Sequence, residues 1–311
     1  MLPHIRLGLC CTFAEQPIKF RSTTVTHLLK VGEAEARKKL SEICRHNATA
    51  LMESLRFCEA NCIGCFRVNS GLLPCATHDA VGYSLRELPD GEELLAMFEG
   101  CGAFARAKGI RTCFHPDQFV VLNSARPEVV ESSIKELDHQ AEMACWINAD
   151  VVNIHAGSSQ GGKDSALELF AHNFQRLSRS AKELLTVEND DKVYTPTDLL
   201  PLCHSLGVPL VYDAHHHRCK PDGLGILDAT RAALETWDRE PLFHLSSPRD
   251  GWACKSPSSH ADYIEPLDFP ECWREPSLIA EASGFGTVTV EVEAKAKELA
   301  VLELMKSLRG A

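Results

Sequence analysis

Three runs of the chain decide the fold: VVNIH at 151–155, LTVE at 185–188 and PLVYD at 209–213. Each run is short, apolar and rich in β-branched residues, as strands buried on both faces of a parallel sheet are. Stretches with apolar residues at three- and four-residue spacing separate the runs, which is the pattern of amphipathic helices. The alternation of strand and helix predicts a parallel sheet built from βαβ units.

The same alternation extends to both ends of the chain. We expect eight strands, at Ile5–Cys11, Ile63–Val68, Arg111–His115, Val151–His155, Leu185–Glu188, Pro209–Asp213, Leu242–His244 and Val288–Glu293. We expect helices between them, at Ala34–Glu59, Glu92–Lys108, Pro127–Ile147, Ser165–Leu184, Thr197–Leu206, Leu227–Trp237 and Ala294–Leu308. This pattern predicts a single α/β domain over residues 1–311, a TIM (β/α)₈ barrel. The polar segments Thr12–Gly32 and Ser246–Gly286 are expected to be long loops at its carboxyl-terminal face.

The composition, with 44% hydrophobic and 24% charged residues, is that of a globular protein with a large core. No stretch approaches the ~20 apolar residues of a membrane span, and residues 1–9 do not form a signal peptide. We therefore expect a cytoplasmic monomer with no membrane and no obligate protein partner. The 14 cysteines follow no disulfide framework and are expected to be reduced core residues. The net charge of −11 argues against binding of nucleic acid through the overall field, although bound cations can offset it locally.

Side chains that bind metal ions close six consecutive expected strands. They are His115, His155, Glu188, Asp213, His244 and Glu293, and His216 follows just after Asp213. The carboxyl ends of barrel strands open onto one face, so these side chains should converge. His78 and His260, in the loops after the second and seventh strands, can join them. A lone histidine or glutamate at a strand end is more often a structural group, but six in succession favour a metal centre.

The mixture of imidazoles and carboxylates favours zinc, manganese or iron over the all-oxygen sites of calcium and magnesium. So many candidate ligands exceed the needs of one ion, and the pattern predicts two or three. Closely spaced divalent ions can neutralise a phosphodiester and activate a water molecule. The expected chemistry is attack by a metal-bound hydroxide, with Glu188 or Glu293 bridging the ions.

Motifs spread over nearly the whole chain make it similar to a known family. They are IRLG at 5–8, FRV at 66–68, LP at 73–74, TH at 77–78, FHPDQFV at 114–120, NIH at 153–155, VEND at 187–190, DAHH at 213–216, FHLS at 243–246 and VEAK at 292–295. In this order and spacing they resemble the UV-damage endonuclease family, which is related to the endonuclease-four-type abasic-site nucleases.

The resemblance implies a TIM barrel with two or three metal ions, manganese first and zinc, cobalt or magnesium as alternatives. It implies incision of damaged double-stranded DNA immediately 5′ to pyrimidine dimers and 6-4 photoproducts, and in some cases at abasic sites. Glu188, Glu293, Asp213 and His155 are then the catalytic candidates. The family's metal-ligand pattern carries onto His78, His115, His155, Glu188, Asp213, His216, His244, His260 and Glu293.

The resemblance also implies that Leu9, Gln118 and Phe119 probe the damaged bases. An aromatic side chain can enter a base stack at a lesion, where unstacking costs less, although Phe119 could instead be a core residue at the barrel rim. Family members have tyrosine at the position of Leu9 and lysine at that of Leu242, so neither residue here supplies the family's polar group. The candidates for phosphate contacts in the expected mouth loops are Arg218, Lys220 and Lys255.

Two other functions compete with a nuclease. The spacing of Cys58, Cys62 and Cys65 matches the cluster-binding motif of radical S-adenosylmethionine enzymes, but Cys65 lies inside an expected strand. A metal-dependent sugar isomerase or epimerase of the xylose-isomerase-like barrel superfamily also places metal ligands at strand ends. The number of histidines and the Gln118-Phe119 pair favour the nuclease.

Overall fold

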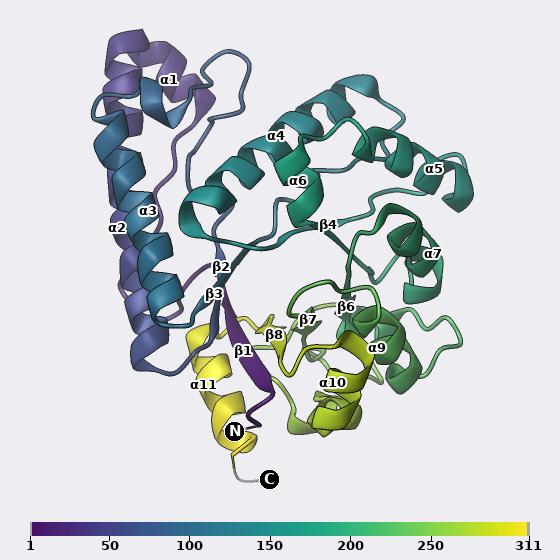
Figure 1. Ribbon diagram of the computed structural model, residues 1–311. Coiled ribbons are helices and arrows are strands. Elements are labelled where there is room, and N and C mark those ends of the chain that lie inside the picture. The colour runs from purple at the N-terminus through teal and green to yellow at the C-terminus, as the bar shows by residue number, and fades with distance from the viewer. Residues whose placement is uncertain (1, 310–311) are drawn as a thin grey trace.

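The computed structural model describes residues 2–309 and contains a closed barrel of eight strands in chain order (Figure 1). All neighbouring strands are parallel, including β1 with β8, which closes the barrel. The predicted TIM barrel is therefore confirmed. The strands are β1 (Ile5–Cys10), β2 (Cys65–Val68), β3 (Arg111–Phe114), β4 (Val152–His155), β5 (Leu185–Glu188), β6 (Leu210–Asp213), β7 (Leu242–Leu245) and β8 (Val288–Val292).

Helices surround the barrel on its outer side (Figure 1). They are α1 (Val25–Val31), α2 (Glu33–Ala60), α3 (Gly91–Ala107), α4 (Pro127–Ile147), α5 (Lys163–Phe174), α6 (Arg179–Leu184), α7 (Pro196–Leu206), α8 (Ala214–Cys219), α9 (Ile226–Leu234), α10 (Pro276–Ser283) and α11 (Glu298–Ser307). Helix α4 has the predicted bounds. Within residues 2–309, no helix is both long and apolar enough to cross a membrane.

Local capping explains the helices that the sequence analysis misplaced. The single helix expected over Ser165–Leu184 is two helices, because the Ser178 side chain accepts a hydrogen bond from the Ala181 N–H and starts α6. Two segments expected as loops contain α1, which Thr24 caps, and α10, which Pro276 begins. Helix α8 starts directly at the end of β6, where the Asp213 side chain accepts from the His216 N–H at 2.7 Å.

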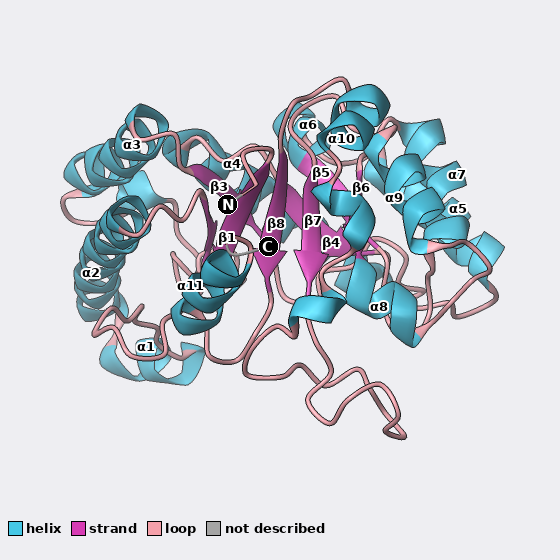
Figure 2. Cartoon of the chain, turned by 90° about the horizontal axis from the view of Figure 1, so that it is seen from below, coloured by secondary structure: helices cyan, strands magenta, loops and turns pink. Residues whose placement is uncertain are grey.

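Side chains alternate between the two sides of each barrel strand. Outward residues such as Leu7, Phe66 and Val290 belong to the main hydrophobic core shared with the helices. Inward apolar residues, among them Cys65 and Leu242, form a separate small cluster. Figure 2 shows long loops extending beyond the arrowheads of the strands, so the carboxyl ends of the inward-facing rows open toward these loops.

Close packing of α3 against α4 gives a test of the helix layer. A Cβ at Gly102 would lie 2.7 Å from backbone atoms of Trp146 and Ile147, whereas a Cβ at Gly100 meets nothing within 4 Å. We predict that Gly102→Ala lowers the free energy of unfolding by about 1–3 kcal/mol, because the two helices must separate. The matched variant Gly100→Ala should raise it by about 0.5–1 kcal/mol, since alanine is the better helix former. Urea denaturation measures both, and equal effects of the two substitutions would contradict this packing.

Candidate metal centre

Glu188, at the end of β5, lies at the centre of a cluster of four histidines. Its Oε2 is 3.0 Å from His115 Nε2 and 4.0 Å from His155 Nε2. Its Oε1 is 3.1 Å from His244 Nδ1 and 3.3 Å from His216 Nδ1. Only 1% of Glu188 is exposed, so the carboxylate has been removed from water and depends on these rings. The two oxygens face different pairs of histidines, as those of a bridging carboxylate do.

The inward side chains at the strand ends form three overlapping groups in which the ligand atoms lie within 4.8 Å of one another. The groups are His115, His155 and Glu188; Glu188, Asp213 and His216; and Asp213, His244 and Glu293. The first two groups share Glu188, and the last two share Asp213. Seven of the nine predicted metal ligands are thereby brought together, from the residue that follows β3 to the residue that follows β8.

Neighbouring polar groups hold these side chains in orientation. His115 Nδ1 lies 3.0 Å from the Pro116 carbonyl, to which it donates, so that its Nε2 lone pair faces the cluster. Asn153, which is inward on β4, donates to Glu188 Oε2 at 2.6 Å. The Asn189 side chain donates to the Asp213 carbonyl at 2.9 Å and accepts from the Asp213 N–H at 3.0 Å, which ties β5 to β6.

Charge interactions within the cluster shift the pKa values of its members. Burial by itself raises the pKa of Glu188, but the His244 and His155 rings hold that pKa well below the usual range of a glutamate. Burial acts to lower the pKa of His244, but Glu188 and Glu293 outweigh it and raise the pKa to about 10. Burial likewise opposes protonation of His216, and Asp213 and Glu188 still raise its pKa well above that of a free imidazole. Without cations, the cluster is therefore held together by protons on its histidines.

Several buried polar atoms in this cluster have no hydrogen-bond partner. They include Asp213 Oδ2, His155 Nδ1 and His244 Nδ1. Unsatisfied buried atoms cost free energy, and these three belong to residues of the groups with metal-ligand spacing. Imidazole nitrogens and carboxylate oxygens are also the donors that zinc, manganese and iron prefer. The residues present therefore fit divalent metal ions.

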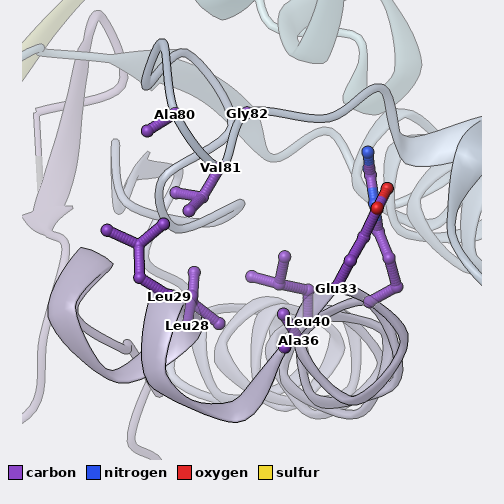
Figure 3. A pocket seen from close by; sticks show the side chains of 10 residues that line it. Leu28, Leu29, Glu33, Ala36, Leu40, Ala80, Val81 and Gly82 are labelled. Carbon is purple, nitrogen blue, oxygen red and sulfur yellow. The ribbon is translucent and has the colours of Figure 1, made fainter.

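Two predicted ligands lie outside the three groups. His260 is at the edge, where its Nδ1 is 3.9 Å from Glu293 Oε2. His78 is exposed, and its Nδ1 accepts from the Ala80 N–H at 3.1 Å. Val81 of the same loop lines a pocket of about 200 Å³ with residues of α1 and α2, which is where this loop packs (Figure 3). The structure therefore does not bring His78 to the cluster.

A cleft of about 790 Å³ connects the metal centre with the predicted lesion probes. His155 and His216 line one part of it, and Gln118 and Phe119 line another. Phe119 is 75% exposed, so it is not a core residue. The prediction for Leu9 is wrong, because this side chain is fully buried in the core between the barrel and the helices and cannot reach a base.

The remaining predicted residues differ in their freedom to bind phosphate. Arg218 donates to the Asp268 carbonyl at 2.7 Å and lies over the Trp252 ring, so its guanidinium is already engaged. Lys220 is half-buried and Lys255 is exposed. Leu242 is buried in the apolar cluster inside the barrel and supplies no polar group to the centre.

The cysteine motif does not form a cluster site. Cys58 is buried in α2 and Cys65 is buried on β2, whereas Cys62 between them is exposed. Among residues 2–309, none of the groups with metal-ligand spacing contains Cys58 or Cys62.

Sequence reasoning missed two buried residues beneath the metal centre. Arg67 lies inward on β2, with its Nη1 2.6 Å from Glu293 Oε1, and Glu291 lies inward on β8. An arginine and a glutamate inside short apolar strands could have indicated them, because a charged side chain in a buried strand needs a partner of opposite charge.

The chain was also compared with known proteins. The family model described as UV-endonuclease UvdE matches residues 5–311. The chain belongs to the UvdE family of UV-endonucleases. Relatives named UV DNA damage endonuclease include one from Bacillus velezensis, 30% identical over 96% of this chain and 91% of the relative. Another, from Nostoc sp., is 31% identical over 96% of this chain and 88% of the relative.

One solved structure agrees with this membership of the UvdE family, and two others share the fold. The crystal structure of SacUVDE is 28% identical, covers 99% of both chains and superposes with a TM-score of 0.84. Endonuclease IV from Thermus thermophilus, at 17% identity, and D-psicose 3-epimerase from Clostridium cellulolyticum, at 10%, both give TM-scores of 0.58. At these identities the last two matches show the barrel fold alone. Membership of the UvdE family makes the chain an endonuclease, which cleaves phosphodiester bonds.

The raised histidine pKa values predict how metal binding depends on pH. A divalent ion must displace the protons that His216 and His244 hold at neutral pH, so we expect Mn²⁺ binding to release at least one proton per chain. Affinity should therefore rise with pH through the neutral range toward the His244 pKa of about 10. Calorimetric titration in two buffers of different ionisation enthalpy measures the protons released. Release should decrease in His244→Gln, and binding without proton release in the unmodified chain would contradict this description of the cluster.

Proposed function

We propose that this chain is a metal-dependent repair endonuclease that incises UV-damaged duplex DNA immediately 5′ to the lesion. The lesions proposed are pyrimidine dimers and 6-4 photoproducts, with abasic sites as a further substrate. The observation that supports this best is the cleft that joins the Glu188 cluster to the exposed Phe119 side chain. A lesion held near Phe119 would place the neighbouring backbone near the metal ligands.

Two or three divalent ions, manganese first, would be held by the three overlapping groups. When bound, such ions neutralise the phosphodiester, lower the pKa of a water molecule and stabilise the departing oxygen. Glu188 and Asp213 are shared between groups, so each of them would contribute to holding two neighbouring ions. Glu293 is held from the other side by Arg67, which limits its movement when the substrate binds.

The pKa of His155 is shifted in the opposite direction to the pKa values of His216 and His244. Burial lowers its pKa below the ordinary value, even though the Glu188 charge acts in the opposite direction. The ring is therefore neutral at neutral pH and offers a lone pair, either to an ion or to a proton of an attacking water. Its position on the wall of the cleft allows the second role as well as the first.

Lesion recognition is proposed for the Gln118-Phe119 pair. An exposed aromatic side chain beside a cleft can replace a base in the stack while the damaged nucleotide turns out of the duplex. A damaged pair stacks and pairs poorly, so this exchange costs less at a lesion than in intact DNA. The cleft, at about 790 Å³, lies within the size range of pockets that bury small ligands.

The net charge of −11 requires that cations be gathered near the site. Arg126 and Lys192 line the same cleft as Phe119. Lys295 and Lys297 line a second cleft of about 380 Å³ with His260 and Glu293. We propose these four side chains, with Lys220 and Lys255, as the phosphate contacts, while Arg218 stabilises the loop around Asp268.

Metal-dependent incision is tested on an end-labelled duplex that has been irradiated with ultraviolet light. With Mn²⁺, the unmodified chain should produce a nick immediately 5′ to the dimer. Glu188→Gln and His115→Ala should abolish the nick, because each removes a ligand from the first group, and chelation of the metal should do the same. The matched controls Glu303→Gln and His204→Ala change exposed helix residues and should nick at the original rate. Equal cutting of unirradiated duplex would contradict lesion specificity.

Substitution of the lesion probes should separate recognition from chemistry. Stacking of an aromatic side chain on a base contributes about 1–3 kcal/mol, so Phe119→Ala should reduce the preference for damaged duplex by roughly tenfold or more. Gln118→Ala should reduce the same preference, and both variants should keep their metal ions. Leu29→Ala, which removes an exposed apolar side chain outside this cleft, is the control. The proposal for this pair fails if competition between damaged and intact duplex is unchanged.

A further inference from the structure

Glu291 lies directly beneath the metal centre, two residues before Glu293 on the inward side of β8. Only 1% of its surface is exposed. Its Oε1 accepts from the Cys113 thiol at 2.7 Å, and its Oε2 accepts from Arg67 Nε at 2.7 Å and from Arg67 Nη2. The same Oε2 is 2.9 Å from His244 Nε2. Both carboxylate oxygens are therefore satisfied, and one of them faces a metal-site histidine.

The His244 ring lies between two sets of carboxylates. Its Nε2 faces Glu291, whereas its Nδ1 faces Glu188 Oε1 at 3.1 Å and Glu293 Oε1 at 3.5 Å. Nδ1 has no hydrogen-bond partner, and the ring is fully buried. A neutral imidazole has one N–H and one lone pair, so the proton on one nitrogen decides which nitrogen can bind an ion.

Because Arg67 lies beside His244, the ring nitrogen of His244 that carries the proton depends on Glu291. Arg67 Nη2 lies 2.9 Å from His244 Nε2, and a guanidinium can only donate. If Nε2 carries the proton, Glu291 Oε2 at 2.9 Å can accept it together with the Arg67 N–H groups, and the Nδ1 lone pair then points into the cluster. Without that carboxylate, Nε2 would accept from Arg67, and the proton would move to Nδ1, where it blocks an ion.

We propose that Glu291 is a positioning residue that keeps the proton of His244 on Nε2 and so directs Nδ1 to the metal ion of the Asp213–His244–Glu293 group. This inference rests on the proposed metal-dependent function and adds a residue that determines it. Glu291 also has ligand spacing with Cys65 and Cys113. Both oxygens of Glu291 already accept hydrogen bonds, from Cys113 and from Arg67. We therefore assign these residues the role of holding Glu291 in place against His244.

Metal affinity measured with Mn²⁺ alone tests the proposal without any DNA. Loss of a carboxylate that orients a metal-binding histidine costs about 10–100-fold in affinity, and we expect this loss in Glu291→Leu. Glu291→Gln keeps one acceptor oxygen and should restore part of the affinity. The control is Glu240→Gln, a carboxylate paired with Arg6 at 2.7 Å and bonded by Thr289 at 2.6 Å. It should keep the original affinity whatever its effect on unfolding. Unchanged affinity in folded Glu291→Leu, or an equal loss in Glu240→Gln, would overturn the proposal.

A second measurement uses the unmodified chain and does not depend on how the variants fold. Zn²⁺ is diamagnetic, so ¹⁵N-resolved spectra of the Zn²⁺-loaded chain can locate the proton of each histidine. We expect the His244 proton on Nε2, and a proton on Nδ1 would overturn the proposal. If the Zn²⁺-loaded chain shows this tautomer but the Mn²⁺-loaded chain does not nick irradiated duplex, the proposed function fails and the role of Glu291 stands.

Discussion

The structure depends on one buried carboxylate, that of Glu188, which four histidines surround. Removing a carboxylate from water costs free energy unless its charge is paired. Neighbouring positive charges must offset that cost. In the protein without ions, protons on His216 and His244 supply the positive charge. Divalent cations supply it more effectively, because the same oxygens and nitrogens become ligands. Metal binding and the stability of the barrel mouth are therefore linked.

The barrel makes this arrangement possible by separating its two sets of side chains. Outward residues of the strands are almost uniformly apolar and pack against the helices. This shared core stabilises the fold. Inward residues change along the barrel, from the apolar cluster around Leu242, through the ion pair of Arg67 and Glu291, to the cluster around Glu188. The hydrogen-bonded strands of the barrel hold these charged side chains, which keeps the ligand atoms at coordinating distance.

The sequence predicted the barrel and most of the cluster because both follow from local pattern. Asp213 and Glu188 end apolar runs, and topology alone then brings strand ends together. His78 and Leu9 could not be placed in this way. The position of His78 depends on how its loop packs, and a resemblance located Leu9 without telling which face of β1 it occupies. Glu291 was overlooked because its partners, Arg67 and His244, are distant in the sequence, and only the closed barrel shows that they meet.

We propose that the side chains around Glu188 and Asp213 hold divalent cations at the mouth of the barrel. Metal binding there is tested most directly by anomalous diffraction from crystals grown with Mn²⁺, recorded near the manganese absorption edge. We expect at least two anomalous peaks within the three ligand groups, each within coordinating distance of Glu188 or Asp213. Crystals with no peak there, in which Glu188 keeps its contacts to the four histidine rings, would contradict this proposal.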